Sequence, residues 1–477
     1  MPGKVSGEVP GTAAPPLARV IALAAVAWQA LRAGQSLERA AAAALRTAAP
    51  DPQRSAPPVS EARLAAAVRD TLYACARRRA LIDALVAALA SRPPEPSLEA
   101  LVGVALALLV GRAYADHVVV DQAVGAARAH PAWRPAAGFV NAVLRAFLRR
   151  RPQLLDDAER SPSVRYNLPA WWLERLQAAY PLQWQDVAVE QATPPPLTLR
   201  VNVRRTTVER MLQRFAEAGM SASPLGPAAP AAIWIHQPRP VDAIPGFAEG
   251  LVSVQDAAAQ WAAPCLGAAD GMRVLDACAA PGGKSAHLLE LAKIRLDAVE
   301  IDAVRASRIG ADLQRLGLPA PGRDSSVRVH VADASQPATF WDGQPYDRIL
   351  LDAPCTGSGV VRRHPDIPWL RRPSDVAELA TRQAALLDAL WPLLAPTGRL
   401  LYVVCSVFPE EARSQSAAFA QRHPDARASG FVAFGPAGGR DRATVQWLPR
   451  AQLRWLGAGD GPDVRDGFFF ALFEKVG

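Results

Sequence analysis

Residues 272–285 read MRVLDACAAPGGKS, a short apolar run that leads into a turn with two adjacent glycines. Such a run, bounded by a turn, is typical of a buried strand, and residues 285–292 after the turn have the composition of a helix. A strand, a glycine-bearing turn and a helix in this order commonly hold a small ligand at the turn. The stretch therefore predicts an α/β domain with a ligand site at residues 278–284.

Two familiar phosphate-binding motifs do not fit this turn. A P-loop ending in Gly283-Lys284-Ser285 would need a glycine at position 278, where the chain has Cys278. The dinucleotide fingerprint G-x-G-x-x-G fails as well, because Gly282 and Gly283 are the only glycines of the turn. The turn therefore predicts a close approach of the backbone to a neutral or zwitterionic ligand.

Strands and helices alternate along the chain from about Phe247 onward. This alternation predicts right-handed crossovers and a mainly parallel sheet with helices on both faces. The predicted strands are 273–277, 295–301, 327–332, 348–352, 399–404 and a terminal 467–473. The predicted helices between them are 285–292, 303–316 and 375–394.

Acidic residues stand at the carboxyl ends of the first four predicted strands: Asp276, Glu300, Asp333 and Asp352. Any one of them alone is more typical of a turn or a helix N-cap. Parallel strands, however, bring all four carboxyl ends to one edge of the sheet, where Glu300 can accept from both hydroxyls of a ribose and Asp333 from an adenine amino group. A ligand with ribose and adenine but without a phosphate contact indicates S-adenosylmethionine.

Two cysteines follow neighbouring strands of this pattern. Cys355 ends the motif DAPC at 352–355, and Cys405 follows the fifth predicted strand. A single cysteine is most often a buried apolar residue, but both are predicted at the same edge beside Lys284, whose ammonium group can lower the pKa of a thiol. Lys284 is one of only four lysines among 53 basic residues. The histidines are scattered and the five cysteines form no CxxC pair, so no metal site is expected.

The motifs CAAPGGK at 278–284, DAPC at 352–355 and Cys-Ser at 405–406 resemble the signature of the RsmB/Sun family of 16S rRNA cytosine-C5 methyltransferases. The resemblance continues in SVQDAAAQ at 253–260, RRHPDIPWLRR at 362–372, SVFPEE at 406–411 and DGFFFALF at 466–473. GFVNAVLR at 138–145 is similar to the NusB-like RNA-binding domain of bacterial members, and LTLRVN at 197–202 resembles their small middle domain. The resemblance thus covers nearly the whole chain.

The resemblance implies a catalytic role for four residues. Cys405, as a thiolate, would add to C6 of a cytosine, and C5 would then attack the methyl group of S-adenosylmethionine. Asp352 would hydrogen-bond the pyrimidine edge near N3 and N4, with Lys284 beside the thiols. Cys355 would help to release the product by elimination after the C5 proton leaves.

The resemblance also implies the cofactor site. Cys278 would lend its backbone and a small side chain to the turn and would not be a nucleophile. Glu300 stands where the family commonly has aspartate, and its longer side chain still reaches a ribose. The implied cofactor-binding residues are Cys278, Ala279, Ala280, Pro281, Gly282, Gly283, Lys284, Glu300, Asp333 and Asp352.

The region before the α/β pattern is alanine- and leucine-rich and predicts an all-helical bundle. Expected helices are 60–77, 79–90, 97–112, 117–128 and 138–150, and the pattern that begins near Val20 is continued by Glu38 as one first helix. Residues 1–151 hold 19 Lys or Arg against 10 Asp or Glu, whereas the whole chain has a net charge of +8. The excess of basic residues includes the arginines at 77–79 and 149–151. It is as consistent with a polyanion partner as with solvent-exposed helix ends.

At 477 residues the chain is too long for one ordinary core. We expect a flexible tail at 1–16, a NusB-like helical RNA-binding domain at 17–151, a linker and small α/β (RRM-like) subdomain at 152–245, and a Rossmann-like methyltransferase domain at 246–477. The small subdomain is predicted from helices at 170–179 and 208–218 around a strand at 197–202. No apolar run is long enough to cross a bilayer, and a cytoplasmic monomer is the expectation.

The function expected from these observations is transfer of a methyl group from S-adenosylmethionine to C5 of a specific cytosine in 16S rRNA, through a covalent cysteine–C6 adduct. A transfer RNA cytosine-C5 methyltransferase and a non-catalytic RNA-binding assembly factor are the alternatives. A scaffold would not need two thiols at one edge. A DNA cytosine methyltransferase would use the Pro-Cys thiol alone and would leave Cys405 unexplained.

Overall fold

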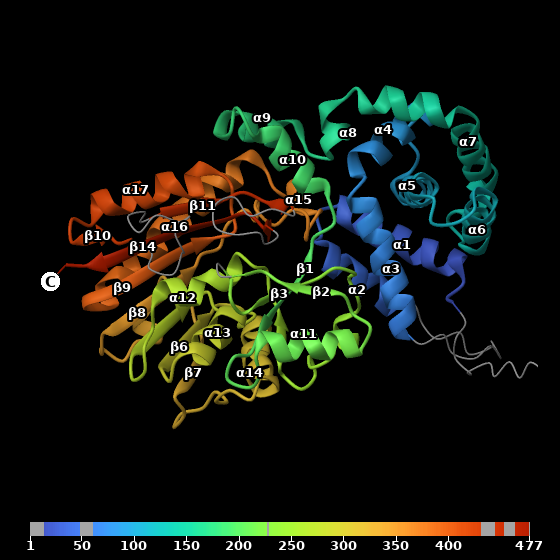
Figure 1. Cartoon of the computed structure of the whole chain (residues 1–477). Helices are drawn as coiled ribbons and strands as arrows, with labels where there is room; N and C mark the ends of the chain where they lie inside the picture. The colour runs from blue at the N-terminus through green and yellow to red at the C-terminus, as the bar shows by residue number, and fades with distance from the viewer. Residues whose placement is uncertain (1–13, 48–60, 227–228, 431–443, 453–462, 477) are drawn as a thin grey trace, which may run out of the picture. The chain divides into compact units, whose positions relative to one another are not determined.

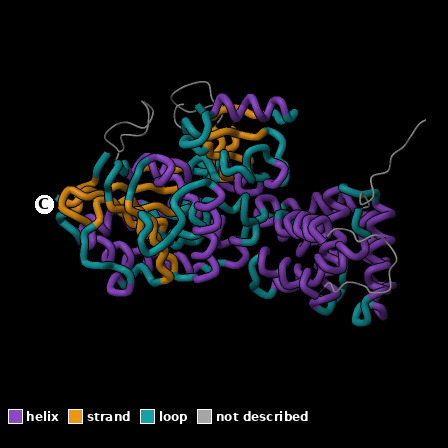
Figure 2. Tube along the Cα trace, turned by 90° about the horizontal axis from the view of Figure 1, so that it is seen from below, coloured by secondary structure: helices purple, strands orange, loops and turns teal. Residues whose placement is uncertain are grey.

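The computed structural model describes residues 14–47, 61–226, 229–430, 444–452 and 463–476. It divides into two compact units: the helical unit, Met1–Glu174 with His364–Arg371, and the sheet unit, Arg175–Arg363 with Arg372–Gly477. Helices are purple and strands orange in Figure 2. Residues 1–13 of the predicted tail lie outside the described residues. No helix in the described ranges is long and apolar enough to cross a membrane.

The helical unit is a bundle built around α5 (Pro96–Gly111), labelled in Figure 1. Residues 100–109 of α5 are all buried, as expected of a helix that is apolar on every side. Around α5 pack α1 (Leu17–Arg32), α3 (Glu61–Ala76), α4 (Arg79–Leu89), α6 (Asp116–Ala129) and α7 (Ala137–Glu159). The helical unit also contains α2 (Leu37–Thr47), α8 (Pro162–Tyr166) and α15 (Ile367–Leu370), and α9 (Ala170–Ala179) begins in it.

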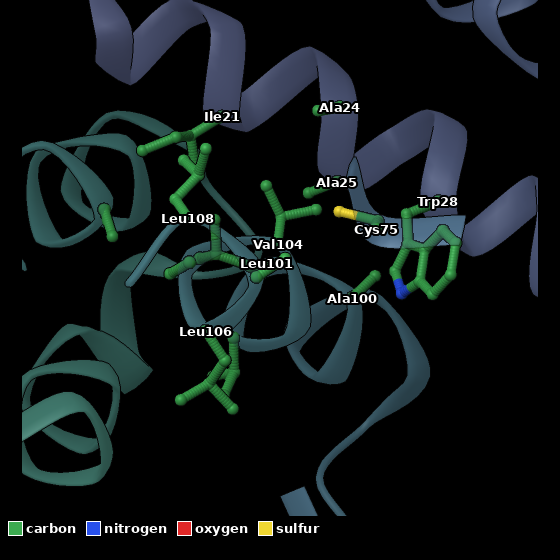
Figure 3. Packing of buried hydrophobic residues seen from close by; sticks show 14 of the residues in the cluster. Ile21, Ala24, Ala25, Trp28, Cys75, Ala100, Leu101, Val104, Leu106 and Leu108 are labelled. Carbon is green, nitrogen blue, oxygen red and sulfur yellow. The ribbon is translucent and has the colours of Figure 1, made fainter. Parts of the chain in front are cut away.

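Figure 3 shows the core of the bundle, where Trp28 of α1, Cys75 of α3 and Val104 of α5 are fully buried. Burial raises the pKa of Cys75 to about 12, so this thiol stays protonated. It therefore packs as a small apolar side chain in the core of the bundle.

Helices α3 to α6 agree with the predicted ranges to within one residue at each end. The expectation of one first helix from Val20 through Glu38 is wrong. Helix α1 ends at Arg32, Gly34 adopts a φ of 101°, and α2 begins at Leu37. Helix α7 runs on through Pro152 to Glu159, beyond the predicted end at residue 150. Apolar spacing alone does not show such breaks and extensions, because neighbouring helices keep the same periodicity.

Residues 364–371, which lie far along the chain, belong to the helical unit. The carboxylate of Asp366, 5% exposed, accepts a hydrogen bond of 2.9 Å from the backbone N–H of Leu37 at the start of α2. An acid at this place satisfies an N-terminal donor and complements the helix dipole. The guanidinium of Arg79 lies 5.0 Å from the ring centroid of Trp369. The sequence motif RRHPDIPWLRR thus contributes a segment that packs with the helices.

The sheet unit is centred on a sheet with strand order β10-β14-β9-β8-β5-β6-β7, and β11 pairs with β14. Neighbouring strands are parallel among β5 (Arg273–Ala277), β6 (Arg295–Glu300), β7 (Val327–Val331), β8 (Tyr346–Asp352) and β9 (Leu394–Val404). The antiparallel strands are β14 (Phe468–Lys475), β10 (Ala426–Ala428) and β11 (Thr444–Trp447). This is the Rossmann-like α/β fold that the alternating pattern predicts.

Helices cover both faces of this sheet. One hydrophobic cluster includes α12 (Ala262–Leu266), α13 (Gly283–Leu291) and α14 (Ala303–Arg315), and a second includes α16 (Pro373–Leu390) and α17 (Arg413–Arg422). All six predicted strands are present. The helix predicted at 375–394 ends earlier, at Leu390, and β9 begins at Leu394 instead of residue 399. A separate two-stranded ribbon joins β12 (Arg450–Gln452) to β13 (Asp463–Arg465).

A second, four-stranded sheet of the sheet unit has the order β2-β3-β1-β4. It comprises β1 (Leu197–Val201), β2 (Ala222–Pro224), β3 (Ala232–Ile235) and β4 (Val252–Val254), with α11 (Val208–Glu217) packed on it and α10 (Trp184–Ala192) preceding it. Arg200 of β1 joins it to α13, because its guanidinium lies 2.8 Å from Glu290 and also donates to the carbonyl of Gly283 at 2.7 Å. The small sheet thereby supports the start of α13.

Replacing Arg200 by methionine is expected to destabilise the sheet unit by about 3–5 kcal/mol, because Glu290 would stay buried without its cation. Burial raises the pKa of Glu290, and Arg200 opposes that effect. Denaturant unfolding followed by fluorescence would measure the loss. Arg214→Met is the matched control, since the Arg214–Glu249 pair is exposed and should leave the midpoint nearly unchanged. A double change of Arg200 and Glu290 to methionine should recover much of the loss; equal losses in single and double variants would contradict the argument.

Candidate active site

The carboxyl ends of the parallel strands meet at a cavity of about 300 Å³. This volume lies at the lower end of the range usual for small-molecule sites. The cavity brings together residues predicted from separate strands: Cys278, Glu300, Asp333, Asp352, Cys355 and Cys405. The expectation that Asp276 also lines it is wrong, because this side chain is fully buried and is not part of the cavity wall.

Of the predicted turn at 278–284, Cys278 and Ala280 line the cavity, whereas Ala279, Pro281, Gly282, Gly283 and Lys284 are not part of its wall. Cys278 adopts a φ of 62°, and Gly282 adopts a φ of 107° directly before α13. A Cβ atom on Gly282 would lie 3.1 Å from the Cα of Ile309 in α14, so glycine lets the two helices approach closely at this point. Burial raises the pKa of Cys278 to about 12, so this thiol stays protonated. The cysteine of the turn is therefore a poor nucleophile.

Glu300 at the end of β6 and Asp333, two residues after β7, line the cavity. Glu300 is 2% exposed, and its Oε2 accepts from the backbone N–H of Ala280 at 3.3 Å, which orients the carboxylate. Oδ1 of Asp333 accepts from the backbone N–H and the hydroxyl of Ser335 at 2.9 and 2.8 Å, and these bonds lower the pKa of Asp333. Both groups are thus held as oriented acceptors.

The cavity suits an adenosine-bearing ligand. Ile301, next to Glu300, lines the cavity and is 54% exposed, so it offers an apolar surface to a flat ring. Asp333 supplies an acceptor nearby, and Glu300 supplies one for a ribose. The sequence did not indicate Ile301, because an apolar residue at a strand end is usually buried.

Asp276 lies in β5 beneath the cavity, fully buried, and accepts a hydrogen bond from the hydroxyl of Ser285. Within the described residues its Oδ1 has no hydrogen-bond partner. Burial is the main cause that raises the pKa of Asp276 to about 7, with a further contribution from Asp352. This carboxyl group is therefore largely protonated below neutral pH.

Changing Asp276 to asparagine is expected to stabilise the protein above pH 7 and to have little effect near pH 4. The pKa of Asp276 in the folded protein, about 7, exceeds its usual value of 3.8. The free energy of unfolding of the wild type therefore falls as pH rises from 3.8 to 7. The asparagine variant has no carboxyl group at this position and lacks this dependence. The full difference is on the order of 4 kcal/mol. Unfolding by urea at pH 4, 6 and 8 measures it, with exposed Asp324→Asn as control. A difference independent of pH would contradict the expectation.

Lys284, the second residue of α13, forms a partly buried ion pair with Asp352, which lines the cavity, whereas Lys284 itself is not part of the cavity wall. Its Nζ lies 2.6 Å from Oδ2 of Asp352 and 5.6 Å from the ring centroid of Phe468. Burial alone would lower the pKa of Lys284, but Asp352 and, to a smaller extent, Cys405 raise it above its usual value. The ammonium group therefore stays charged beside Asp352.

The two predicted thiols lie together. The Sγ atoms of Cys355 and Cys405 are 3.3 Å apart. The hydrogen bond to Cys405, followed by burial, raises the pKa of Cys355 well above its usual value. All five cysteines of the chain are free. The site thus pairs one thiol held in its protonated form with a second thiol, in a cavity that is also lined by Asp352.

The part of the cavity wall that comes from α16 was not indicated by the sequence. Arg382 and Leu386 lie one turn apart on α16 and line the cavity opposite the strand ends. The spacing of apolar residues along α16 does not show which face of the helix lines the cavity. Among the described residues, no group of three His, Cys, Asp or Glu side chains could hold a metal ion.

Three family profiles match the chain. A profile of the 16S rRNA methyltransferase RsmB/F family matches residues 263–474. A profile of the RsmF/B-like ferredoxin-like domain matches residues 168–242, and one of the NusB family matches residues 18–149. The order of these profiles follows the order of the helical bundle, the small sheet and the large sheet.

Curated relatives and solved structures are similar to the chain as well. The chain is 45% identical over 339 residues to the ribosomal RNA small subunit methyltransferase B of Salmonella typhi and to that of Salmonella agona (strain SL483), covering 71% of this chain and 73% of each relative. The crystal structure of PH0851 matches 98% of this chain and all of its own with a TM-score of 0.74 at 24% identity. The structure of NSun6 from Pyrococcus horikoshii with SFG covers 65% of this chain and 98% of its own, with a TM-score of 0.55 at 17% identity. These two structures share the fold.

The matches include the turn, the acids and both thiols of the cavity, which all lie within residues 263–474. The methyl donor of such enzymes is S-adenosylmethionine, and the oriented acceptors Glu300 and Asp333 fit its adenosine part. From the identity to full-length relatives and the three profiles in their order, we conclude that the chain belongs to the RsmB/F family of 16S rRNA methyltransferases.

Proposed function

We propose that this protein transfers a methyl group to C5 of a specific cytosine in 16S rRNA through a covalent adduct between Cys405 and C6. The observation that carries this proposal is the 3.3 Å separation of the Cys355 and Cys405 sulfur atoms in a cavity that is also lined by Asp352, the partner of Lys284. A reaction in which one sulfur adds and must later leave has a use for a second thiol. A methyltransferase acting on an oxygen or an amino group has none.

In this proposal S-adenosylmethionine, bound against the turn and held through Glu300 and Asp333, supplies an electrophilic methyl group. The Cys405 sulfur forms a bond to C6, and the electron pair displaced from the C5–C6 double bond makes C5 nucleophilic. Asp352 hydrogen-bonds the pyrimidine edge, and Lys284 holds Asp352 in place through the 2.6 Å contact. C5 takes the methyl group and S-adenosylhomocysteine leaves. The C5 proton then passes to water, the electron pair of the C5–H bond re-forms the C5–C6 double bond, and the C6–S bond breaks to return the Cys405 thiolate, with Cys355 assisting release.

We propose that the helical domain, residues 17–151, docks the RNA, that residues 152–245 form the small subdomain with its linker, and that residues 246–477 perform catalysis. Arg149 and Arg150 of α7 are exposed and suit phosphate contacts. Arg77 and Arg79 suit them less, because they are half-buried and lie over the rings of Tyr73 and Trp369. The target base would be flipped into the cavity. A monomer in the reducing cytoplasm fits the free thiols.

The test uses unmodified 16S rRNA that carries tritium at C5 of its cytosines. Methylation at C5 must release one tritium into water for each methyl group transferred, whereas methylation of an oxygen or an amino group releases none. We expect the amount of tritium released into water to equal the amount of methyl groups transferred to the RNA. Methyl transfer without tritium release would overturn the C5 assignment. Transfer RNA serves as the second substrate: labelling of transfer RNA alone would retain the chemistry and exclude the 16S rRNA assignment.

A further inference from the structure

A buried carboxylate below the cavity connects the two loops that carry the thiols. Glu411 is fully buried, six residues after Cys405 in the chain. Its Oε1 accepts from the backbone N–H of Thr356 at 2.8 Å, and its Oε2 accepts from the Thr356 hydroxyl at 2.6 Å. Its Oε2 also accepts from the hydroxyl of Ser406 at 2.6 Å. Thr356 directly follows Cys355, and Ser406 directly follows Cys405.

Further contacts fix the carboxylate from the side of α16. Gln383, also fully buried, donates to Oε1 of Glu411 at 3.2 Å and to the carbonyl of Pro354 at 2.9 Å. The hydroxyl of Tyr402 lies 2.6 Å from the backbone carbonyl oxygen of Glu411. Both oxygens of the carboxylate thus have two donors each, which favours the ionised form inside the protein.

The two loops also meet directly. The hydroxyls of Ser358 and Ser406 are 2.9 Å apart, and the Ser358 hydroxyl accepts from the backbone N–H of Val407 at 2.9 Å. The backbone N–H of Gly359 donates to the carbonyl of Cys405 at 2.9 Å. These bonds join segments about 50 residues apart in the chain, and Glu411 is the charged group at their centre.

Stability alone does not explain a carboxylate in this place. Within the described part of the chain no cationic side chain forms an ion pair with Glu411, and burial raises its pKa against the effect of its hydrogen bonds. A buried charge without an ion pair is costly, and an apolar or neutral side chain would hold a scaffold at lower cost. Its negative charge also contributes to the raised pKa of Cys355.

We propose that Glu411 is a positioning residue: its carboxylate ties the Cys355 loop to the Cys405 loop and sets the separation at which addition and release can act on one cytosine. This inference rests on the proposed function for its catalytic consequence. The geometry that it concerns exists without RNA. Its effect on the free enzyme can therefore be measured independently of methyl transfer.

Glu411→Gln keeps the shape of the side chain but removes the charge and one acceptor oxygen. The kcat for methyl transfer is expected to fall tenfold to a hundredfold, because small misplacements of reacting groups cost this much, while the Kd for S-adenosylmethionine stays unchanged. Thr356→Val removes one donor of the same network and should act in the same direction with a smaller loss, which covers the case that Glu411→Gln does not fold. Glu410→Gln is the matched control, since Glu410 is adjacent and its side chain is 44% exposed.

The second measurement needs no RNA. Iodoacetamide alkylation of Cys355 and Cys405 is followed by mass spectrometry as a function of pH in the free enzyme. In Glu411→Gln the pH midpoint for alkylation of Cys355 is expected to move down, because the negative charge of Glu411 contributes to the raised pKa of this thiol, and Glu410→Gln should match the wild type. A purely structural role would lower the melting temperature and leave both kcat per folded enzyme and the alkylation midpoint unchanged, which would overturn the proposal.

The two measurements separate the two proposals. A shifted alkylation midpoint in Glu411→Gln, together with no tritium release by the wild type, would support the positioning role and reject the C5 chemistry. Normal tritium release by the wild type, together with an unshifted midpoint and a normal kcat in Glu411→Gln, would reject the positioning role alone.

Discussion

Methyl transfer to 16S rRNA is expected to fall by at least about 10⁴-fold when Cys405 is changed to alanine. C5 of cytosine gains nucleophilic character only when a sulfur atom adds to C6, and alanine leaves no group at this position. Cys355 is a poor replacement, because burial and the nearby Glu411 carboxylate still raise the pKa of this thiol once its hydrogen bond to Cys405 is lost. Transfer of labelled methyl groups under single-turnover conditions measures the loss.

Cys355→Ala should give the opposite kind of defect. The adduct would still form at Cys405, but the product would leave slowly, so a protein–RNA complex resistant to denaturation should accumulate. A denaturing gel with labelled RNA shows this complex. Cys265→Ala is the matched control, because Cys265 is buried in α12 and does not line the cavity. If Cys405→Ala still methylates and Cys355→Ala does not, Cys355 is the nucleophile and the proposed order of events is wrong.

Lys284→Met is expected to lower kcat by about 10²- to 10³-fold. The substitution keeps most of the side-chain volume but leaves the Asp352 carboxylate without the ammonium group that lies 2.6 Å away. It also removes the positive charge that interacts with Cys405. Both the orientation of the pyrimidine edge and the stabilisation of a thiolate would suffer, so the loss should appear in kcat more than in the KM for RNA.

Lys293→Met is the control for this change, because Lys293 is an exposed lysine outside the cavity. It should retain the activity of the wild type. Binding of S-adenosylmethionine to Lys284→Met, measured by calorimetry, tests whether the turn at 278–284 is intact. A Lys284→Met enzyme with normal kcat would show that the ion pair has only a structural role.

Much of the site could be predicted from residues near strand ends. Glu300, Asp333, Asp352, Cys355 and Cys405 all line one cavity, as the alternation of strands and helices indicates. Asp276 was misplaced, because its position one residue before the end of β5 turns its side chain into the interior. A one-residue shift along a strand moves a side chain to the other face, and the sequence does not give strand ends to that precision.

Other parts of the site depend on segments that are distant in the chain. The motif SVFPEE was noticed as a resemblance, but the bonds of Glu411 to Thr356 and Ser406 were not predictable from it. Arg382 and Leu386 reach the cavity because of the way α16 packs on the sheet. Likewise, the packing of residues 364–371 with the helical unit has no signal in periodicity or composition.

The sequence by itself determined the fold class and the edge of the sheet at which the cavity lies, while the domain bounds and the roles of the site residues stay predictions. It could do so because parallel strands joined by right-handed crossovers place all their carboxyl ends on one side, whatever the details of packing. The tertiary structure decided the 3.3 Å separation of the two thiols, the pairing of Lys284 with Asp352 and the bridging position of Glu411. These distances result from hydrogen bonds and packing between segments 50 or more residues apart, and no local pattern encodes them.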